Sequence, residues 1–346
     1  MSRATVSNIT QSAVALPLDT DERVEERLRI LFRNKEAYSE NTWKQMLSVI
    51  RCFARWCEAR DKVWLPASPD DVADYLYHLK HDLNRTVNTV NQHHAQINNI
   101  HKHAGLARPS ESMEVSLGMK RMRRTAVTSG ERISQAIPLH VRDVFRLADF
   151  WDSSDRLADR RNLAFIGVAY NSLLRISEVA RLRVQDIHFQ PDGSATLNVG
   201  YTKTIVDQYG VVKKLSEEVA GWLKEWIELA NLADTPDALV FCKVGRYNHA
   251  QQIAEPLARV NIEKIFAAAW FTANGISKGT KRYRTWTGHS ARVGAAQDMA
   301  EHGKTLPQIM HEGTWKRPEQ VLNYIRNIDA EKSVMLDIVK GGKRDK

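Results

Sequence analysis

The spacing of apolar side chains most limits how the first part of this chain can fold. In the stretch TWKQMLSVIRCFARWCEAR, apolar residues recur every three or four positions and form one stripe of a helix. A second helix is expected after Ser68, which can cap it, and a third from about Thr86 to His103. A fourth pattern ends in the basic run Lys120–Arg124. We therefore expect an all-helical domain over residues 21–124.

The helical pattern stops at residues 125–137, where TAVTSGERISQAI shows little apolar periodicity and predicts an interdomain linker. Helices resume beyond it, apart from DIHFQPDGSATLNVGYTKTIVDQYGVVKKL, whose short apolar stretches are broken by turn residues. This pattern predicts a small three-stranded antiparallel sheet. The second domain, residues 138–346, is thus expected to be mainly α-helical around that sheet, and residues 1–20 to form a disordered arm.

The balance of charge narrows the classes of partner. Lys and Arg outnumber Asp and Glu by 50 to 41, which gives a net charge of +9 and favours a polyanion such as nucleic acid. The three cysteines lack C-x-x-C spacing, which argues against a disulfide framework or a cysteine zinc site. No apolar run reaches the roughly 18 residues of a membrane span, and the first residues do not resemble a signal peptide. We expect a cytoplasmic protein without a membrane partner.

Arg175 and Glu178 lie three residues apart in YNSLLRISEVARL, so they share one face of a predicted helix. Taken alone, such a pair is usually a solvated ion pair. The flanking apolar residues, however, indicate a largely buried segment. A buried arginine needs a partner or an anion that arrives from outside.

Three further residues each have an ordinary structural explanation when taken singly. Lys203 falls at the turn between the second and third predicted strands, where a lysine is normally solvated but can also reach into a cleft. Trp315 lies in a predicted turn, and Tyr324 at the edge of the apolar side of the next helix. That tyrosine alone fits the margin of a core.

The stretch TWTGHSARVGAA places His289 and Arg292 three residues apart, after a glycine and before small residues. A metal site, a base with its partner, an anion cradle or a plain helix start all fit this pattern. Thr287 is the predicted cap, and the free N–H groups at a helix start favour phosphate. No further metal ligand lies nearby in the sequence, which disfavours a metal.

Four histidines are concentrated in NQHHAQINNIHKH, at positions 93, 94, 101 and 103. A metal site is possible there, but no carboxylate or cysteine accompanies the histidines. We expect a polar helix face instead, laid on a nucleic acid.

Together these positions resemble the tyrosine site-specific recombinases, most closely the Cre-like group. The resemblance runs from about residue 35 and includes YNSLLRISEVARLRVQDI, TGHSARVGAAQDMA and NYIRN. Seven positions match in order and spacing: Arg175, Glu178, Lys203, His289, Arg292, Trp315 and Tyr324.

The resemblance implies a role for each position. Tyr324 is the expected nucleophile, and Arg175 and Arg292 are expected to grip the non-bridging oxygens of the scissile phosphate. His289 is the expected proton acceptor or hydrogen-bond donor, and Lys203 the acid that protonates the leaving 5′ oxygen.

The remaining two positions are expected to support these groups, Trp315 through its indole N–H and Glu178 by orienting the neighbouring cations. The reaction implied is DNA strand cleavage through a 3′-phosphotyrosine intermediate and exchange through a Holliday junction. Because the phosphotyrosyl bond retains the energy of the broken link, no ATP, metal or other cofactor is expected.

The resemblance also implies a C-shaped clamp on double-stranded DNA with an inverted-repeat site, a dimer on each site and a homotetramer on two sites. A helix over residues 330–340 is expected to dock into a neighbouring protomer. The helices near residues 86–103 and after Arg259 are the predicted readers of the major groove. Candidate DNA contacts are Trp43, Lys44, Arg85, Asn88, Asn91, Gln92, Lys120, Arg121, Arg123, Arg124, Arg259, Asn261, Arg282 and Arg284.

Two alternatives stay open at this point. A type IB topoisomerase uses the same tyrosine chemistry without exchanging strands between partners. A DNA-binding accessory protein could keep the fold without the reaction. The target sequence is not implied, because AEPLARVNIEKIF and the region around residues 84–96 depart from Cre at base-reading positions.

Overall fold

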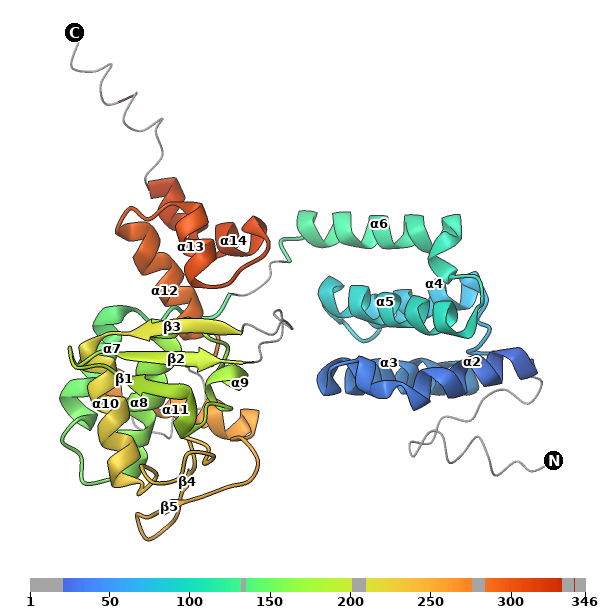
Figure 1. Cartoon of the computed structure of the whole chain (residues 1–346). Coiled ribbons are helices and arrows are strands. Elements are labelled where there is room, and N and C mark those ends of the chain that lie inside the picture. Colours follow the sequence, from blue (N-terminus) through green and yellow to red (C-terminus); the bar gives the residue numbers. More distant parts are fainter. Residues whose placement is uncertain (1–20, 132–134, 201–209, 276–283, 332–338, 340–346) are drawn as a thin grey trace. The chain divides into compact units, whose positions relative to one another are not determined.

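The computed structural model describes residues 21–131, 135–200, 210–275, 284–331 and 339. The chain divides into two compact units, Met1–Ile133 and Ser134–Lys346 (Figure 1). Each unit has a hydrophobic core of its own. The predicted arm over residues 1–20 and Lys203 lie outside the described residues. So does the predicted docking helix over residues 330–340, except for residues 330, 331 and 339.

The first unit is all-helical, as predicted. Its helices are α2 (Glu22–Arg33), α3 (Glu40–Glu58), α4 (Pro69–His81), α5 (Val87–Ala104) and α6 (Met113–Thr128), with 3₁₀ turns η1 (Lys35–Ala37) and η2 (Pro109–Glu111). Phe53, Trp56 and Tyr75 stack in one buried cluster, and Leu28 and Met46 belong to a second. No helix formed by the described residues is long and apolar enough to cross a membrane.

Short polar side chains set where these helices begin. The side-chain oxygens of Ser39, Ser68 and Thr86 each accept a hydrogen bond from the backbone N–H three residues later, at N···O distances of 3.2, 3.1 and 3.3 Å. Each bond satisfies one of the N–H groups that a helix start leaves free. At the other end of α5, Gly105 takes the left-handed conformation, with φ 74°.

The segment 125–137, expected as linker, differs from the prediction at its start. α6 continues to Thr128, so the first four residues of that segment are helical. Ala126 is buried in the first unit, and the next glycine, Gly130, follows the helix end. Burial of Ala126 therefore outweighs the weak helix propensity of the neighbouring threonines. The division between the two units falls after Ile133, within the same segment.

The second unit is mainly helical around a small sheet, again as predicted. Its longer helices are α7 (Val141–Trp151), α8 (Leu157–Ser172), α10 (Glu217–Leu229), α11 (Arg259–Asn274), α12 (Ser290–Glu301) and α14 (Pro318–Glu331). The shorter elements are α9 (Ile176–Val179), α13 (Leu306–Glu312), η3 (Val184–Asp186), β1 (Ile187–Phe189), β2 (Ala195–Val199), β3 (Val211–Leu215), β4 (Lys243–Val244) and β5 (Ala250–Gln251).

The predicted sheet has the order β1-β2-β3 and is antiparallel throughout. Its register pairs Ile187 with Leu197, and Leu197 with Lys213. The two-stranded hairpin β4–β5 was not predicted, because two residues on each strand are too few to show an alternating pattern.

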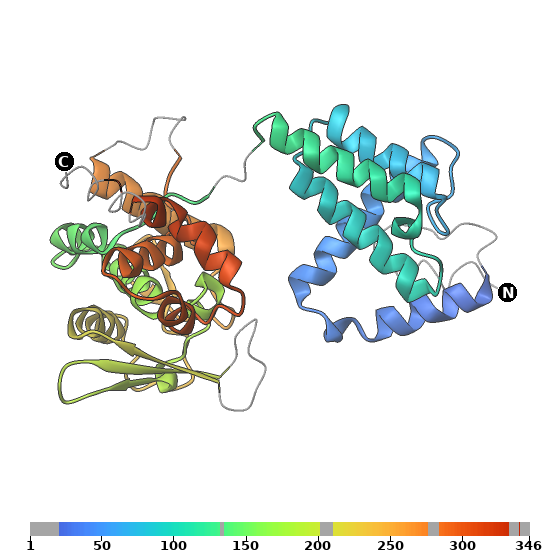
Figure 2. The same ribbon diagram turned by 90° about the horizontal axis from the view of Figure 1, so that it is seen from above.

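α8 is the central element of the second unit, with all its residues from Asn162 to Ala169 buried. It packs against α7, α10 and α12. α12, α13 and α14 form a further cluster around Trp315, Val321 and Ile325, seen from above in orange to red in Figure 2. The C-terminal end of α8 and the start of α12 meet this cluster, and the candidate site is built there.

Candidate active site

Arg175 and Glu178 are held together by the start of a short helix. α8 ends at Leu173 in the left-handed conformation, with φ 53°, and Arg175 then caps α9. The Arg175 backbone N–H donates to Glu178 Oε2 at 2.9 Å, and Arg175 Nη1 lies 3.0 Å from Glu178 Oε1. Only 5 % of the Glu178 side chain is exposed. The pair is therefore not a solvated surface ion pair. Glu178 holds Arg175 both at its backbone N–H and at its guanidinium.

The start of α12 differs by two residues from the predicted cap. Thr287 and Ser290 bond to each other, with Thr287 N donating to Ser290 Oγ at 2.9 Å and Ser290 N to the Thr287 carbonyl at 2.8 Å. This turn places His289, and not Thr287, at the N-cap position. His289 is consequently exposed at the helix start, while Arg292 lies one turn in and points into the protein.

Arg292 is 2 % exposed and is held by backbone carbonyls. Its Nη2 donates to the Gly313 carbonyl at 2.9 Å and its Nη1 to the Leu173 carbonyl. The guanidinium carbon lies 4.6 Å from the centre of the Trp315 ring, in a cation–π contact. A guanidinium has five N–H groups, so these two bonds leave donors for an anion.

Small residues behind Arg292 let α12 approach the chain closely. A Cβ placed on Gly294 would lie 1.7 Å from the carbonyl oxygen of Leu139. Leu139 also donates its N–H to the Ser290 carbonyl at 3.1 Å. The glycine is therefore required by packing, as the run of small residues in the sequence suggested.

Tyr324 points from α14 toward the start of α12. Its hydroxyl lies 2.7 Å from His289 Nε2, and its ring centre lies 5.8 Å from that of Trp315. Burial raises the pKa of Tyr324, while the positive charges of Arg292 and Arg175 lower it. The phenol is thus protonated at neutral pH and needs a neighbour that can accept its proton.

The charges of the site make His289 suitable for that task. Desolvation lowers the pKa of His289 most, followed by Arg292 and Arg175, so the imidazole is neutral at pH 7 although its edge is exposed. Burial, and then the neighbouring Arg175, lowers the pKa of Arg292 to about 10, which leaves that guanidinium charged. The arrangement joins a neutral acceptor, a phenol and two cations.

Six of the seven positions singled out from the sequence thus lie in one site, and the seventh, Lys203, lies outside the described residues. The sequence analysis missed one charged residue of this region, Lys213. It is 8 % exposed, and its Nζ donates to the Glu312 carbonyl. A lysine at an inward-facing position of the alternating strand VVKKL was the available clue.

The candidate DNA contacts of the first unit have different surroundings. Trp43 packs with its ring centre 5.1 Å from that of Phe32 and is partly buried, while Lys44 pairs with Glu40. Arg123 of α6 donates to Asn91 of α5 at 2.9 Å, so the two helices share one polar surface. The exposed candidates here are Lys44, Arg85, Asn88, Gln92, Lys120, Arg121, Arg123 and Arg124.

The histidines of α5 do not form the polar face expected from the sequence. His101 is 1 % exposed, and the others are half-buried. His93 bonds to the Tyr75 hydroxyl at 2.9 Å and His103 to that of Tyr38 at 2.7 Å. Among the described residues no group of three potential ligands is arranged to hold a metal. His93 thus ties α5 to α4, and His103 ties α5 to the segment that follows η1.

Two candidates of the second unit, Arg259 and Asn261, lie in the first turn of α11. The Arg259 side chain is 86 % exposed and lies 3.5 Å from Glu263, whose other oxygen accepts from Gly288 N at 3.1 Å. Arg284 donates to the Gln135 carbonyl, and Arg282 lies outside the described residues. Through Glu263, α11 is tied to the residue that precedes His289.

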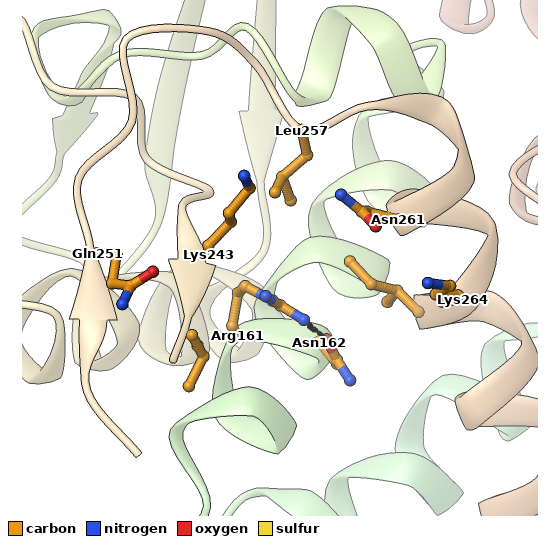
Figure 3. Close-up of a pocket in the computed structure, with 9 residues that line it drawn as sticks. Arg161, Asn162, Lys243, Gln251, Leu257, Asn261 and Lys264 are labelled. Carbon is orange, nitrogen blue, oxygen red and sulfur yellow. Dashed lines mark hydrogen bonds between the residues drawn. The ribbon is translucent and has the colours of Figure 1, made fainter. Parts of the chain in front are cut away.

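Asn261 lines a cavity of about 450 Å³ that the sequence did not reveal (Figure 3). Three of the lining residues are cations, Arg161, Lys243 and Lys264, and none is acidic. Arg161 donates to Asn162 Oδ1 at 2.8 Å and to the Cys242 carbonyl at 3.3 Å, both neutral acceptors. A cavity with three cations and no acid lining it suits an anion.

Comparison with known proteins gives the context for this site. Residues 139–331 match the phage integrase family. The chain is 42% identical over 337 residues to recombinase Cre of Escherichia phage P1, covering 96% of this chain and 98% of that one. It is 24% identical to an integrase/recombinase XerD homologue of Selenomonas ruminantium, covering 88% and 87%.

Two solved structures share the fold at low identity. The Tn1549 transposon integrase in complex with circular intermediate DNA matches with a TM-score of 0.57 and 14% identity, covering 87% of this chain and 94% of that chain. The XerH recombinase bound to palindromic difH substrate matches with a TM-score of 0.58 and 12% identity, covering 90% and 83%.

Proposed function

Because the chain belongs to the phage integrase family and is a Cre-like tyrosine recombinase, we propose that it recombines DNA through a covalent bond to Tyr324. The predicted family is confirmed, and the chain is a site-specific DNA recombinase. The single observation that supports the assignment of the nucleophile is the 2.7 Å contact between the Tyr324 hydroxyl and His289 Nε2, beside the cation–π pair of Arg292 and Trp315.

In the proposed cleavage step the Tyr324 oxygen attacks the scissile phosphorus and its proton passes to His289. Arg175 and Arg292 hold the two non-bridging oxygens, on which negative charge increases in the transition state. The phosphorus–O5′ bond breaks, and the leaving oxygen takes a proton from Lys203. Religation is the reverse step with a 5′-hydroxyl from another strand.

The two supporting residues act on the arginines and on the phosphate. Glu178 fixes Arg175 through a bond to its backbone and one to its guanidinium. Trp315 places its indole between Arg292 and Tyr324, where the indole N–H can donate to a phosphate oxygen. The step exchanges one phosphodiester bond for another, so ATP is not needed, and we propose that no metal takes part.

DNA is the proposed partner of both units. In the first unit the exposed cations and amides of α5 and α6 meet the duplex, with α5 as a reader of the major groove. In the second unit Arg259 and the start of α11 read bases, and the cavity with Arg161 takes a backbone phosphate. We further propose a dimer on each inverted-repeat site and a tetramer on two sites, joined through residues 330–340, with a Holliday junction between the exchanges.

The test begins with selection of bound duplexes from random DNA, which is expected to return an inverted repeat around a short spacer. A nicked duplex of that sequence is then expected to trap a covalent protein–DNA adduct in the presence of EDTA. Tyr324→Phe is expected to abolish the adduct, while Tyr77→Phe, at an exposed tyrosine of α4, is the matched control. An adduct that survives Tyr324→Phe would assign the nucleophile elsewhere.

The alternative of a type IB topoisomerase predicts different products. Such an enzyme relaxes supercoiled DNA of any sequence and never joins strands from two molecules. The 42% identity with recombinase Cre over almost the whole chain favours recombination. Two labelled duplexes with the selected site decide the question, because only a recombinase yields a product that carries both labels.

A further inference from the structure

Lys213 occupies a position that a strand normally gives to an apolar side chain. Along β3 its neighbours Val212 and Lys214 are exposed, Val212 by 62 %, whereas Lys213 is 8 % exposed and pairs with the buried Leu197. Taking an ammonium group out of water is costly unless the group gains strong partners. A buried lysine at this position is therefore expected to have a specific partner.

That partner is the carbonyl end of α13. Lys213 Nζ donates to the carbonyl of Glu312, the last residue of α13. The next carbonyl, that of Gly313, accepts from Arg292 Nη2 at 2.9 Å. Carbonyl groups at a helix end lack partners within the helix and carry partial negative charge. Two cations from separate elements, β3 and α12, thus hold two consecutive carbonyls of one turn.

This turn places the Trp315 indole. Thr314 has the left-handed conformation, with φ 52°, and Trp315 N donates back to the Met310 carbonyl at 2.9 Å. A Cβ on Gly313 would lie 1.9 Å from the Trp315 ring, so the ring lies directly on the turn. The indole is set by the backbone of the turn, and a shift of that backbone would move it.

Lys213 is also within the electrostatic reach of the reacting groups. Burial lowers the pKa of Lys213 most, Arg292 lowers it further, and Glu312 and Glu178 raise it. The lysine is therefore close enough to Arg292 and Glu178 to sense their charge. Its exposed neighbour Lys214 instead pairs with Asp192 at 3.5 Å.

We propose that Lys213 is a positioning residue of the recombination reaction: from β3 it holds the turn that carries Trp315 against Arg292, and so sets the indole relative to the scissile phosphate. This rests on the proposed function, since the role of Trp315 belongs to it. Lys213 does not touch the reacting atoms; it acts through the Glu312 carbonyl and the turn.

The experiment compares adduct formation on a nicked duplex of the selected site. Lys213→Met keeps the aliphatic stem and loses the donor, and is expected to slow cleavage by about tenfold to a hundredfold, as small misplacements of catalytic groups do. Equilibrium binding of the same duplex is expected to stay within about twofold of the wild type. Lys213→Arg restores a donor and is expected to recover most of the rate. Lys214→Met, which removes the same charge from the exposed face of β3, is expected to cleave like the wild type.

A double-mutant cycle with Trp315→Phe tests whether the effect passes through the indole. If Lys213 acts by placing Trp315, adding Lys213→Met to Trp315→Phe slows cleavage by less than about twofold more. Additive losses in the double mutant, or equal losses in Lys213→Met and Lys213→Arg, would overturn the proposal. Wild-type cleavage by Lys213→Met would overturn it as well.

Two further arms separate other causes. In a substrate with sulfur at the 5′ bridging position, the thiolate leaving group departs without needing a proton. If this substrate restores the cleavage rate of Lys213→Met, Lys213 acts as an acid and the positioning role is overturned. If Lys213→Met does not fold, Lys213→Gln takes its place in the same cycle. Absence of any adduct with the wild-type protein would instead refute the proposed function itself.

Discussion

Replacing His289 with glutamine tests whether the imidazole accepts the proton of Tyr324. Glutamine keeps a hydrogen-bonding side chain at the start of α12 but has no basic nitrogen. The structure places His289 Nε2 2.7 Å from the Tyr324 hydroxyl, and the pKa of His289 is lowered by burial and then by Arg292 and Arg175. The imidazole is therefore neutral and able to accept a proton even at a pH somewhat below about 6.5, the ordinary pKa of histidine.

The magnitude follows from the ionisation of tyrosine. With an ordinary pKa of about 10, roughly one phenol in a thousand is ionised at pH 7, and burial of Tyr324 reduces that fraction further. Without a base, the reaction depends on this small fraction. We expect His289→Gln to slow cleavage by about 10²–10³, within the usual range for general-base catalysis. Raising the pH by one unit is expected to accelerate the variant roughly tenfold, while the wild type changes little.

The assay is the rate of adduct formation on the nicked selected duplex between pH 6.5 and 9. His188→Gln, at an exposed histidine of β1, is the matched control and is expected to follow the wild type. A His289→Gln variant that is slow but shows the flat pH profile of the wild type would refute the reasoning. Such a result would leave His289 as a hydrogen-bond donor to the phosphate only.

Three other predictions concern packing, DNA contact and pH. Gly294→Ala is expected to lower the melting temperature by several degrees, because the added Cβ would clash with the Leu139 carbonyl. Its control, Gly221→Ala on the open face of α10, is expected to raise the free energy of unfolding by up to about 1 kcal/mol. Arg161→Met is expected to weaken DNA binding on all sequences and to reduce the slope of log K against log salt by about one, measured by fluorescence anisotropy. Burial lowers the pKa of the four α5 histidines, so the unfolded state binds more protons than the folded state at acidic pH. The free energy of unfolding of the first unit is therefore expected to be highest above about pH 6.5 and to fall as the pH drops below that value, by up to about 1.4 kcal/mol per pH unit for each proton. Urea titration with pulse proteolysis measures this change.

The helical elements could be predicted because their causes are local. Ser39, Ser68 and Thr86 bond to backbone N–H groups within three residues, and the apolar stripe of α3 is a property of one helix. The end of α6 was missed because it depends on burial of Ala126 in its unit, which no local pattern shows. The hairpin β4–β5 is too short to carry a period.

The site divides along the same line. The spacing of His289 and Arg292 predicted a shared region, but not that one would be exposed and the other buried. That difference follows from the bond between Thr287 and Ser290, which moves the cap by two residues. The inward lysine of β3 was missed because its partner, the Glu312 carbonyl, lies 99 residues away. A contact with a backbone atom that is distant in sequence does not depend on the type of residue that supplies the atom, so the sequence does not reveal it.

The electrostatics of the free enzyme explain why the substrate completes this site. Burial, and then the positive charge of Arg175, lowers the pKa of Arg292 to about 10. In the proposed reaction a phosphodiester brings negative charge close to both guanidinium groups, and the transition state places more charge on the oxygens that they would face. On this proposal, the repulsion between the arginines is relieved in part when DNA binds and further as Tyr324 attacks. Interactions that strengthen along the reaction in this way accelerate the step itself and do more than hold the DNA.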